Sequence, residues 1–167
     1  MARTGRFRAR LTDEILDECF RSILRERPDL SARSLDRTRQ LMVEAVPDCL
    51  VRNYARLIAG LELPDPEDRH VLAAAIRSGA QTLVTFNLKD FPEATLAGYD
   101  IVAKHPDEFL LGLLDFSAAV VLTVLNEQAE ALRSPRMSVD QVLARLQVMG
   151  MTRFVASVQR LRADETL

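Results

Sequence analysis

Apolar residues recur with helical spacing in three segments of the first sixty residues. The first segment begins after Thr12, whose hydroxyl suits a helix N-cap, and stops at Pro28. The same spacing predicts a second helix over residues 34–46 and a weaker third helix over residues 50–59. This part of the chain is therefore predicted to be helical.

The middle of the chain shows a different pattern, with one helix and two short apolar runs. Asp65 is a natural N-cap for a helix that Gly79 ends. The run "QTLVTF" (81–86) is typical of a buried strand in a parallel sheet, and "YDIVA" (99–103) is a second candidate strand. The order helix, strand, loop, strand favours an α/β layer architecture.

Helical periodicity returns from Pro106 onward and continues to the end of the chain. Breaks at Asp115, Pro135 and Gly150 divide this part into three or four helices. We predict an α/β domain over residues 1–110 and a helical extension over residues 111–167. The extension is expected to pack on the core or on a partner.

The last two predicted helices are short and closely joined, which is compatible with a helix-turn-helix. A DNA-binding helix needs a basic face that can enter the major groove. The outward positions carry only four arginines: Arg145, Arg153, Arg160 and Arg162. Packing is therefore the preferred interpretation, and a DNA-binding regulator is disfavoured.

Composition and charge narrow the possible classes of protein. Hydrophobic residues make up 48% and charged residues 28% of the 167 positions, which is typical of a folded chain. No apolar run approaches the roughly 20 residues that cross a bilayer, so we expect a cytoplasmic protein without a membrane partner. The net charge of −2 means that a nucleic acid would have to be held by a local patch. Cys19 and Cys49 lie among apolar neighbours and are expected to be buried, reduced thiols.

Carboxylates are concentrated at the two ends of the middle unit. Asp65, Glu67 and Asp68 surround the predicted start of its helix, and Asp90 follows its first strand. Each of them has an ordinary structural explanation as a cap, a complement to the helix dipole or a turn former. Together they allow a second explanation, because the start of the helix lies over the carboxyl end of the strand in a right-handed crossover.

That geometry brings Asp65 and Asp68 into the same cleft as Thr85, Asn87 and Asp90. Carboxylates that share a cleft repel one another, and a divalent cation removes the repulsion. Oxygen ligands with few histidines or cysteines select Mg²⁺ or Mn²⁺. A phosphodiester is the natural substrate for such a site.

The residues "LPDPEDRHVLAAAIRSGAQTLVTFNLKDFP", followed by "HPDEFL" (105–110), resemble the second half of PIN domains, in the branch related to VapC-type toxin ribonucleases. The resemblance extends to "LTDEILDECFRSI" upstream and to the helical part downstream. It implies a PIN-like α/β/α sandwich in which acidic residues bind Mg²⁺ or Mn²⁺ and activate a water that cuts single-stranded RNA. It also implies an antitoxin partner and a homodimer or larger assembly.

The resemblance assigns roles to individual positions. Glu18, Asp68 and Asp90 match the catalytic, metal-binding acids of the family, and Asp65 joins them through water. Four further positions are matched to substrate phosphate or to support of the ligands: Thr85, Asn87, Arg69 and His70. The role of Glu18 rests on the resemblance alone, because the helical wheel places it opposite the apolar stripe.

Family members begin with an apolar strand that ends in an aspartate, and these 167 residues contain no counterpart of it. We therefore expect an incomplete sheet, an incomplete metal site and weak or absent ribonuclease activity from this chain. The alternative from a different functional class is a non-catalytic, PIN-derived binding protein that engages an antitoxin or another chain.

Overall fold

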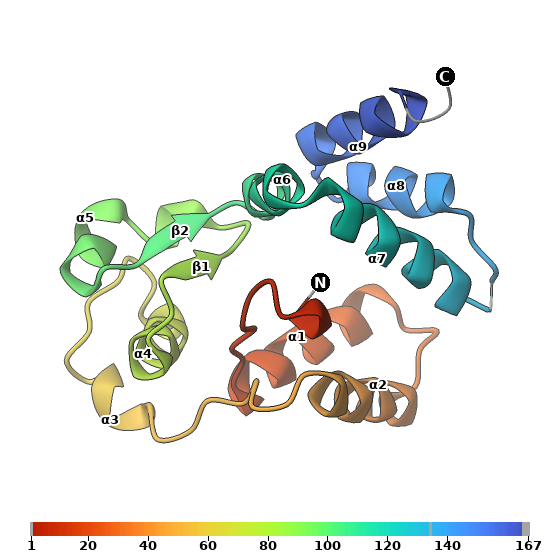
Figure 1. Cartoon of the computed structure of the whole chain (residues 1–167). Helices are drawn as coiled ribbons and strands as arrows, with labels where there is room; N and C mark the ends of the chain where they lie inside the picture. The colour runs from red at the N-terminus through yellow and green to blue at the C-terminus, as the bar shows by residue number, and fades with distance from the viewer. Residues whose placement is uncertain (1, 134, 165–167) are drawn as a thin grey trace. The chain divides into compact units, whose positions relative to one another are not determined.

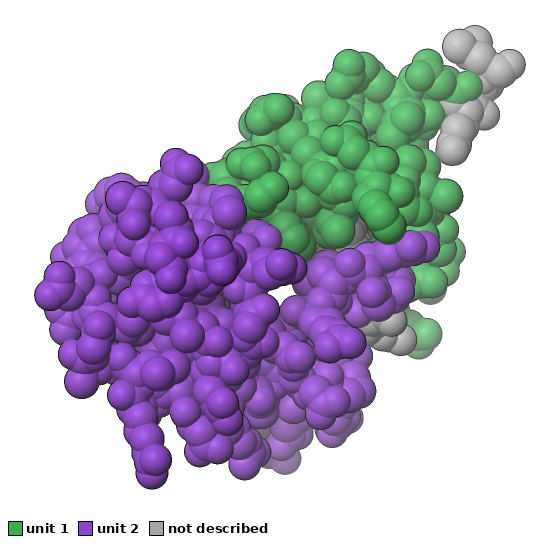
Figure 2. Space-filling model, turned by 60° about the vertical axis from the view of Figure 1, so that its left-hand side comes forward, with its two compact units in different colours: residues 1, 84–86, 104–167 green, residues 2–83, 87–103 purple. Residues whose placement is uncertain are grey.

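The computed structural model describes residues 2–133 and 135–164, which form two compact units, coloured separately in Figure 2. Unit 1 contains residues 84–86 and the chain from residue 104 onward. Unit 2 contains residues 2–83 and 87–103. Each unit has its own apolar core.

Unit 2 starts with a short 3₁₀ turn (Ala2–Thr4) and the helices α1 (Asp13–Glu26) and α2 (Ala32–Ala45) (Figure 1). The predicted cap of α1 is confirmed, because the Thr12 hydroxyl accepts a hydrogen bond of 3.0 Å from the Ile15 backbone N–H. Helix α2 begins two residues before its predicted start. There the Ser31 hydroxyl caps it by accepting a bond of 3.1 Å from the Ser34 N–H.

The third predicted helix is much shorter than expected, since α3 covers only Ala55–Ile58. Leu50 instead forms an isolated parallel bridge with Leu11. The Leu11 N–H donates to the Cys49 carbonyl at 2.8 Å, and the Val51 N–H donates to the Leu11 carbonyl at 2.7 Å. These backbone bonds hold the segment extended, which prevents a helix from starting at residue 50.

The helix that was predicted to begin after Asp65 consists of two parts, a 3₁₀ turn (Pro66–Asp68) and α4 (Arg69–Ser78). Asp65 caps the turn by accepting a 2.9 Å hydrogen bond from the Glu67 N–H. Gly79 ends α4 in the left-handed conformation (φ 64°), as predicted. The buried face of α4 belongs to the core of unit 2, which consists of Leu61, Leu63, Leu72, Ala73, Ala75, Leu83, Phe91, Leu96 and Ile101.

Strands β1 (Thr82–Val84) and β2 (Val102–Lys104) pair in parallel to form a two-stranded sheet. A 3₁₀ turn (Leu88–Asp90), α5 (Glu93–Leu96) and a second turn (Ala97–Tyr99) connect them. The second strand starts later than predicted because Asp100 adopts a left-handed conformation (φ 56°). The α/β class with a parallel sheet and a helical C-terminal part is confirmed.

The described residues of unit 1 fold into four helices after the sheet: α6 (Pro106–Phe116), α7 (Ala118–Ala131), α8 (Val139–Val148) and α9 (Thr152–Asp164). Their shared core is Leu114, Val121, Leu125, Ala129, Val142, Leu143, Met151, Phe154, Val155 and Val158. Ser138 caps α8 through a complete capping box with Gln141. No single described helix is long and apolar enough to cross a membrane. Helices α6 and α7 reach the required length and apolar character only when taken together, and the chain bends by 118° between them.

Asp107 connects the start of α6 to the start of α9. It is buried, and its carboxylate accepts hydrogen bonds from the backbone N–H groups of Phe154 (2.9 Å) and Arg153 (3.3 Å). The first N–H groups of a helix have no partner within the helix and carry partial positive charge, so this carboxylate stabilises α9. The contact joins two segments that are distant in the sequence.

Both cysteines are free thiols, but they differ in exposure. Cys49 is buried, as expected. The expected burial of Cys19 is wrong, because its side chain lies on the exposed side of α1, where Leu16 is the buried residue.

Candidate functional site

Three carboxylates converge at the start of α4. One oxygen from each of Asp65, Asp68 and Asp90 lies within 4.8 Å of the other two. Asp65 and Asp68 lie at the two ends of the 3₁₀ turn before α4, and Asp90 ends the turn that follows β1. Asp68 and Asp90 are half-buried. The start of the helix and the segment after the first strand therefore meet, which is the arrangement that the crossover geometry predicts.

The electrostatics of this group centre on Asp68. Burial raises the pKa of its carboxyl above the ordinary value, and the negative charges of Asp65 and Asp90 raise the pKa further. His70 lowers the pKa of Asp68, and the negative charge of Glu18 raises this pKa by the smallest amount. Negative charge has thus accumulated at a partly desolvated position. A bound cation would offset that charge.

Asn87 supports the group through Asp90. Its side-chain amide donates a hydrogen bond to the Asp90 carboxylate, which fixes the orientation of that carboxylate within the turn after β1. Thr85 directly follows β1 and belongs to unit 1, where its backbone N–H donates to the Lys104 carbonyl at 3.0 Å. The structure therefore brings Asn87 into contact with the acidic group.

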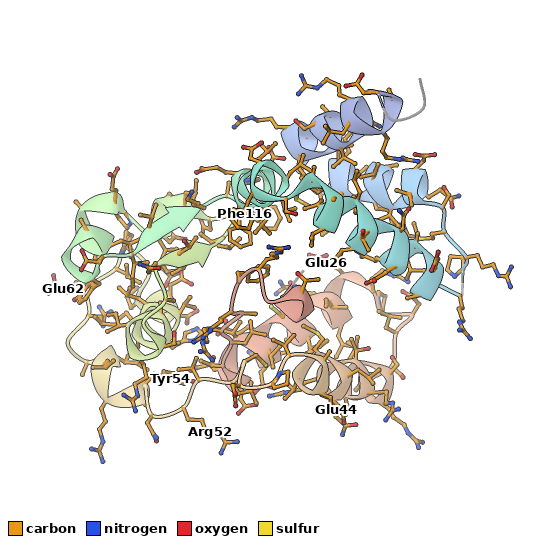
Figure 3. The ribbon with its side chains drawn as sticks, viewed as in Figure 1. Glu26, Glu44, Arg52, Tyr54, Glu62 and Phe116 are labelled. Atoms are coloured by element: carbon orange, nitrogen blue, oxygen red, sulfur yellow. The ribbon has the colours of Figure 1, made fainter. Side chains whose placement is uncertain are left out.

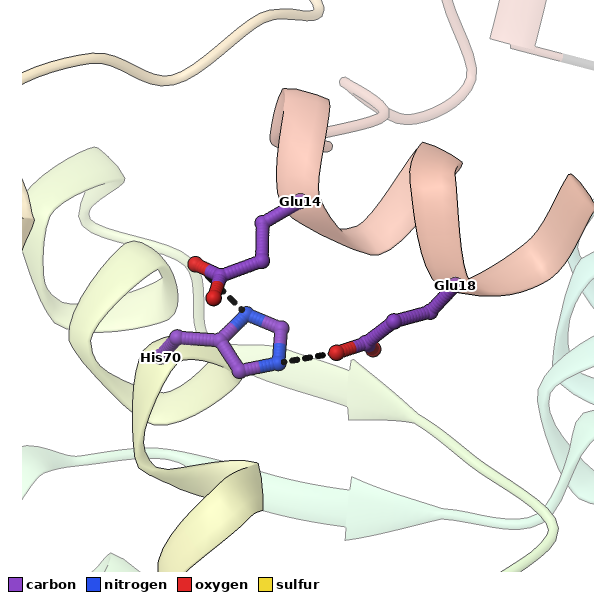
Figure 4. A group of neighbouring side chains, drawn as sticks. All are labelled: Glu14, Glu18 and His70. Atoms are coloured by element: carbon purple, nitrogen blue, oxygen red, sulfur yellow. Dashed lines mark ion pairs between the residues drawn. The ribbon is translucent and has the colours of Figure 1, made fainter. Parts of the chain in front are cut away.

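Glu18 lies in a second group, with Glu14 and His70 (Figure 4). The Nε2 atom of His70 is 3.3 Å from Glu18 Oε1, and its Nδ1 atom is 3.5 Å from Glu14 Oε2. Glu14 and Glu18 are four residues apart on α1, so they share one face of that helix. His70 is buried on α4, whereas both glutamates are exposed. Glu18 thus faces His70, which connects α1 to α4.

Arg69 lies between the two groups in the sequence, at the first position of α4. Its Nε atom is buried and has no hydrogen-bond partner among the described residues. The matched role of Arg69 in binding substrate phosphate remains a prediction.

Sequence reasoning missed Glu14. Glu14 lies in the first turn of α1, where a negative charge has the ordinary explanation of complementing the helix dipole. Its spacing of four from Glu18 was a signal that both side chains leave the helix on one face. The partner of the pair, His70, lies on another helix, and no local pattern identifies that contact.

The three aspartates offer only oxygen atoms, which are the ligands that Mg²⁺ and Mn²⁺ prefer. A cation bound there would supply two elements of phosphodiester hydrolysis, because it orients the phosphate and lowers the pKa of an attacking water. The residues present therefore fit a hard divalent cation.

Replacing Asp68 with Asn is expected to raise the melting temperature of the metal-free chain by about 1 °C, because a like charge is removed. The folded-state pKa of Asp68 is raised, so its carboxyl favours folding below the ordinary aspartate pKa of about 3.9, and this contribution is lost as the pH rises through the folded-state value. The advantage of Asp68→Asn should therefore be present near pH 7 and shrink in acid. Thermal melts at several pH values measure it.

Millimolar Mn²⁺ is the matched condition for that experiment. The cation should raise the melting temperature of the unmodified chain by binding the folded state, and it should raise that of Asp68→Asn less. A marked loss of stability in Asp68→Asn without metal would contradict the expectation. It would show that Asp68 mainly stabilises the start of α4.

Comparisons of the sequence with known proteins give two family matches and one curated relative. The model of the family described as "PIN domain" matches residues 1–89, and that of the "VapC50 C-terminal domain" matches residues 106–160. The chain is 40% identical over 95 residues to a protein of Mycobacterium tuberculosis (strain ATCC 25618 / H37Rv) named "Putative ribonuclease VapC50". The match covers 57% of this chain and 56% of that relative, so the chain spans about half the relative's length. No solved structure matches the chain.

Proposed function

We propose, from the premise that this chain belongs to the PIN domain family, that it is a metal-dependent endoribonuclease of the VapC toxin type acting on single-stranded RNA. The observation that carries the proposal is the convergence of Asp65, Asp68 and Asp90 within 4.8 Å. The similarity to a protein named as a ribonuclease supports the same class of reaction.

In this proposal Asp68 and Asp90 hold the cation directly, together with Glu18, and Asp65 completes the set through water. The cofactor is Mg²⁺ or Mn²⁺, which would activate the water that attacks the phosphodiester. Glu18 must turn from His70 toward Asp68 to take part, and its exposed side chain has room to do so. Asn87 orients Asp90, and His70 is assigned to the substrate phosphate or to support of the ligands. Arg69 and Thr85 are assigned to the substrate phosphate or to support of the ligands.

The proposed activity of these 167 residues alone is weak. Phosphodiester hydrolysis needs a cation fixed on several ligands, and displacing such a site by ~1 Å costs on the order of 100-fold in rate. The described residues supply three converging carboxylates, and Glu18 lies in a different group. A further carboxylate would hold the cation more firmly.

A second candidate function is binding without catalysis, in which a PIN-derived chain engages an antitoxin or another chain. The contact between Glu18 and His70 favours this alternative, because it removes one carboxylate from the proposed cation site. An assay of Mn²⁺-dependent cleavage of single-stranded RNA separates the two functions. Cleavage that Asp68→Asn abolishes supports the enzyme, and its complete absence under all metal conditions supports the binding protein.

The proposed partners are an antitoxin protein and a second copy of the chain, in the cytoplasm. The proposed organisation keeps an α/β domain over residues 1–110 and a helical extension over residues 111–167. This extension would pack on the core or on a partner.

The two-stranded sheet predicts self-association. Among the described residues each strand has a neighbour on one side only, so backbone donors and acceptors remain available at both edges. Val84 and Val102 on these strands are also exposed, by 44% and 54%. Light scattering is expected to show a homodimer or a larger species. A monomer that persists at high protein concentration would contradict this expectation.

A further inference from the structure

The buried imidazole of His70 points to a second kind of metal site. Only 5% of its surface is exposed, and its Nδ1 atom is buried without a hydrogen-bond partner among the described residues. Buried polar atoms in folded proteins are nearly always satisfied by a partner, by water or by an ion. A buried nitrogen of this kind is suited to bind an ion.

Two carboxylates on one face of α1 approach this ring, as Figure 4 shows. Glu14 Oε2 is 3.5 Å from Nδ1, and Glu18 Oε1 is 3.3 Å from Nε2. About half of each glutamate side chain is exposed (49% for Glu14, 47% for Glu18), so an ion can enter from solvent. The three residues thus join a fixed, buried nitrogen to two movable, hydrated carboxylates.

The distances are compatible with one shared ion. One donor atom from each residue lies within 4.8 Å of the other two. Nitrogen and oxygen ligands bind Zn²⁺ at about 2.0–2.2 Å, which places two donors on one ion at most about 4.4 Å apart. The carboxylates face different ring nitrogens, so one of them must rotate toward the other. Glutamate has three rotatable bonds for that movement, and its exposure leaves the space.

Glu14 is already held near the ring by a third segment. Tyr54 is the residue before α3 and is labelled in Figure 3. Its hydroxyl donates a hydrogen bond of 3.1 Å to Glu14 Oε2. Carboxylates that bind metals are commonly oriented by such outer contacts. The remaining oxygen of Glu14 is the one available to an ion.

We propose that His70, Glu14 and Glu18 bind a divalent transition-metal ion of the Zn²⁺ or Co²⁺ type, with water completing the coordination. Imidazole nitrogen is a ligand that such ions favour, whereas Mg²⁺ prefers oxygen. This site therefore differs in chemistry from the three aspartates, and Glu18 serves either this ion or the Mg²⁺ or Mn²⁺ of the proposed function, not both at once. It does not depend on the chain being a ribonuclease.

A titration of the complete 167-residue chain with Co²⁺ tests the proposal, because four-coordinate Co²⁺ absorbs visible light strongly and hydrated Co²⁺ does not. One Co²⁺ per chain should give this absorption, Zn²⁺ should remove it, and Mg²⁺ should not. Glu14→Gln should weaken binding at least about tenfold. Glu14 is exposed and lies outside the proposed Mg²⁺ or Mn²⁺ ligands, and glutamine keeps an oxygen acceptor for the Tyr54 hydroxyl, so we expect this variant to fold. His70→Gln should abolish the signal.

Three matched variants locate the ion. Glu44→Gln removes an exposed carboxylate on α2 (Figure 3), Cys19→Ser removes the exposed thiol next to Glu18, and Asp65→Asn alters the acidic group. All three should bind Co²⁺ as the unmodified chain does. Absence of the absorption, unchanged binding by Glu14→Gln, or loss of binding in Cys19→Ser or Asp65→Asn would each overturn the proposal. Thermal melts identify a variant that fails to fold. If His70→Gln fails to fold, the Co²⁺ binding of Glu14→Gln tests the proposal in its place.

Discussion

Replacing Asp68 with Asn is expected to reduce Mn²⁺-dependent cleavage of single-stranded RNA by at least about 100-fold. Asp68 lies at the centre of the acidic group, between the charges of Asp65 and Asp90, and its removal takes away an anionic ligand of the proposed cation. Changes around metal ligands already cost about 10-fold to 100-fold in affinity or activity. Loss of a ligand itself should cost at least as much.

Glu67→Gln is the matched control for that measurement. Glu67 is an exposed carboxylate in the same 3₁₀ turn, one residue from Asp68, and it does not belong to the converging group. It should cleave at the unmodified rate. The assay should also include a chain preceded by an apolar strand that ends in aspartate, in which the added carboxylate is expected to raise the rate. If Asp68→Asn and Glu67→Gln lose the same amount of cleavage activity, overall charge, and not Asp68, controls the reaction.

The largest effect on stability is expected from Asp107→Ala. The buried Asp107 carboxylate accepts hydrogen bonds from the first N–H groups of α9, at 2.9 Å from Phe154 and 3.3 Å from Arg153. Alanine would leave these donors unsatisfied in the interior, at a cost on the order of 1–3 kcal/mol. For a chain of this size the melting temperature should fall by about 3–10 °C. Thermal melts followed by circular dichroism measure the change.

Two further variants separate the hydrogen bonds from other effects of that substitution. Asp107→Asn retains an oxygen acceptor and should lose less stability than Asp107→Ala. Glu108→Ala removes the neighbouring carboxylate, which is exposed and pairs only at the surface with Lys104. It should change the melting temperature little, since exposed ion pairs contribute about 0–1 kcal/mol. If Asp107→Ala also melts like the unmodified chain, the cap does not stabilise α9.

The parts of the fold that local chemistry determines were predictable from the sequence. Thr12 and Gly79 act at helix ends as predicted, because a cap is made between residues three or four positions apart. The start of the second strand was predicted too early in the sequence, because the apolar pattern carries no information about the backbone conformation of Asp100. The left-handed conformation of Asp100 is not specified by the apolar pattern, and it delays the strand to Val102.

The candidate site was predictable where it follows from connectivity. The helix before the strand and the turn after it must meet in a crossover, so the proximity of Asp68 and Asp90 could be inferred. The contact between Glu18 and His70 could not, because it depends on how α1 packs against α4. The bonds from Asp107 to the start of α9 were equally inaccessible, since no local pattern identifies that pairing.

The backbone bridge between Leu11 and Leu50 has a consequence for how this chain can vary in length. Its two hydrogen bonds close the base of the segment that contains α1 and α2. The entropic cost of closing a loop grows only slowly with the number of residues inside it. Insertions at the far end, in the connection between α1 and α2, should therefore leave the base closed and Thr12 in place. A chain lengthened between α1 and α2 is therefore expected to keep the face of α1 that carries Glu14 and Glu18 in place.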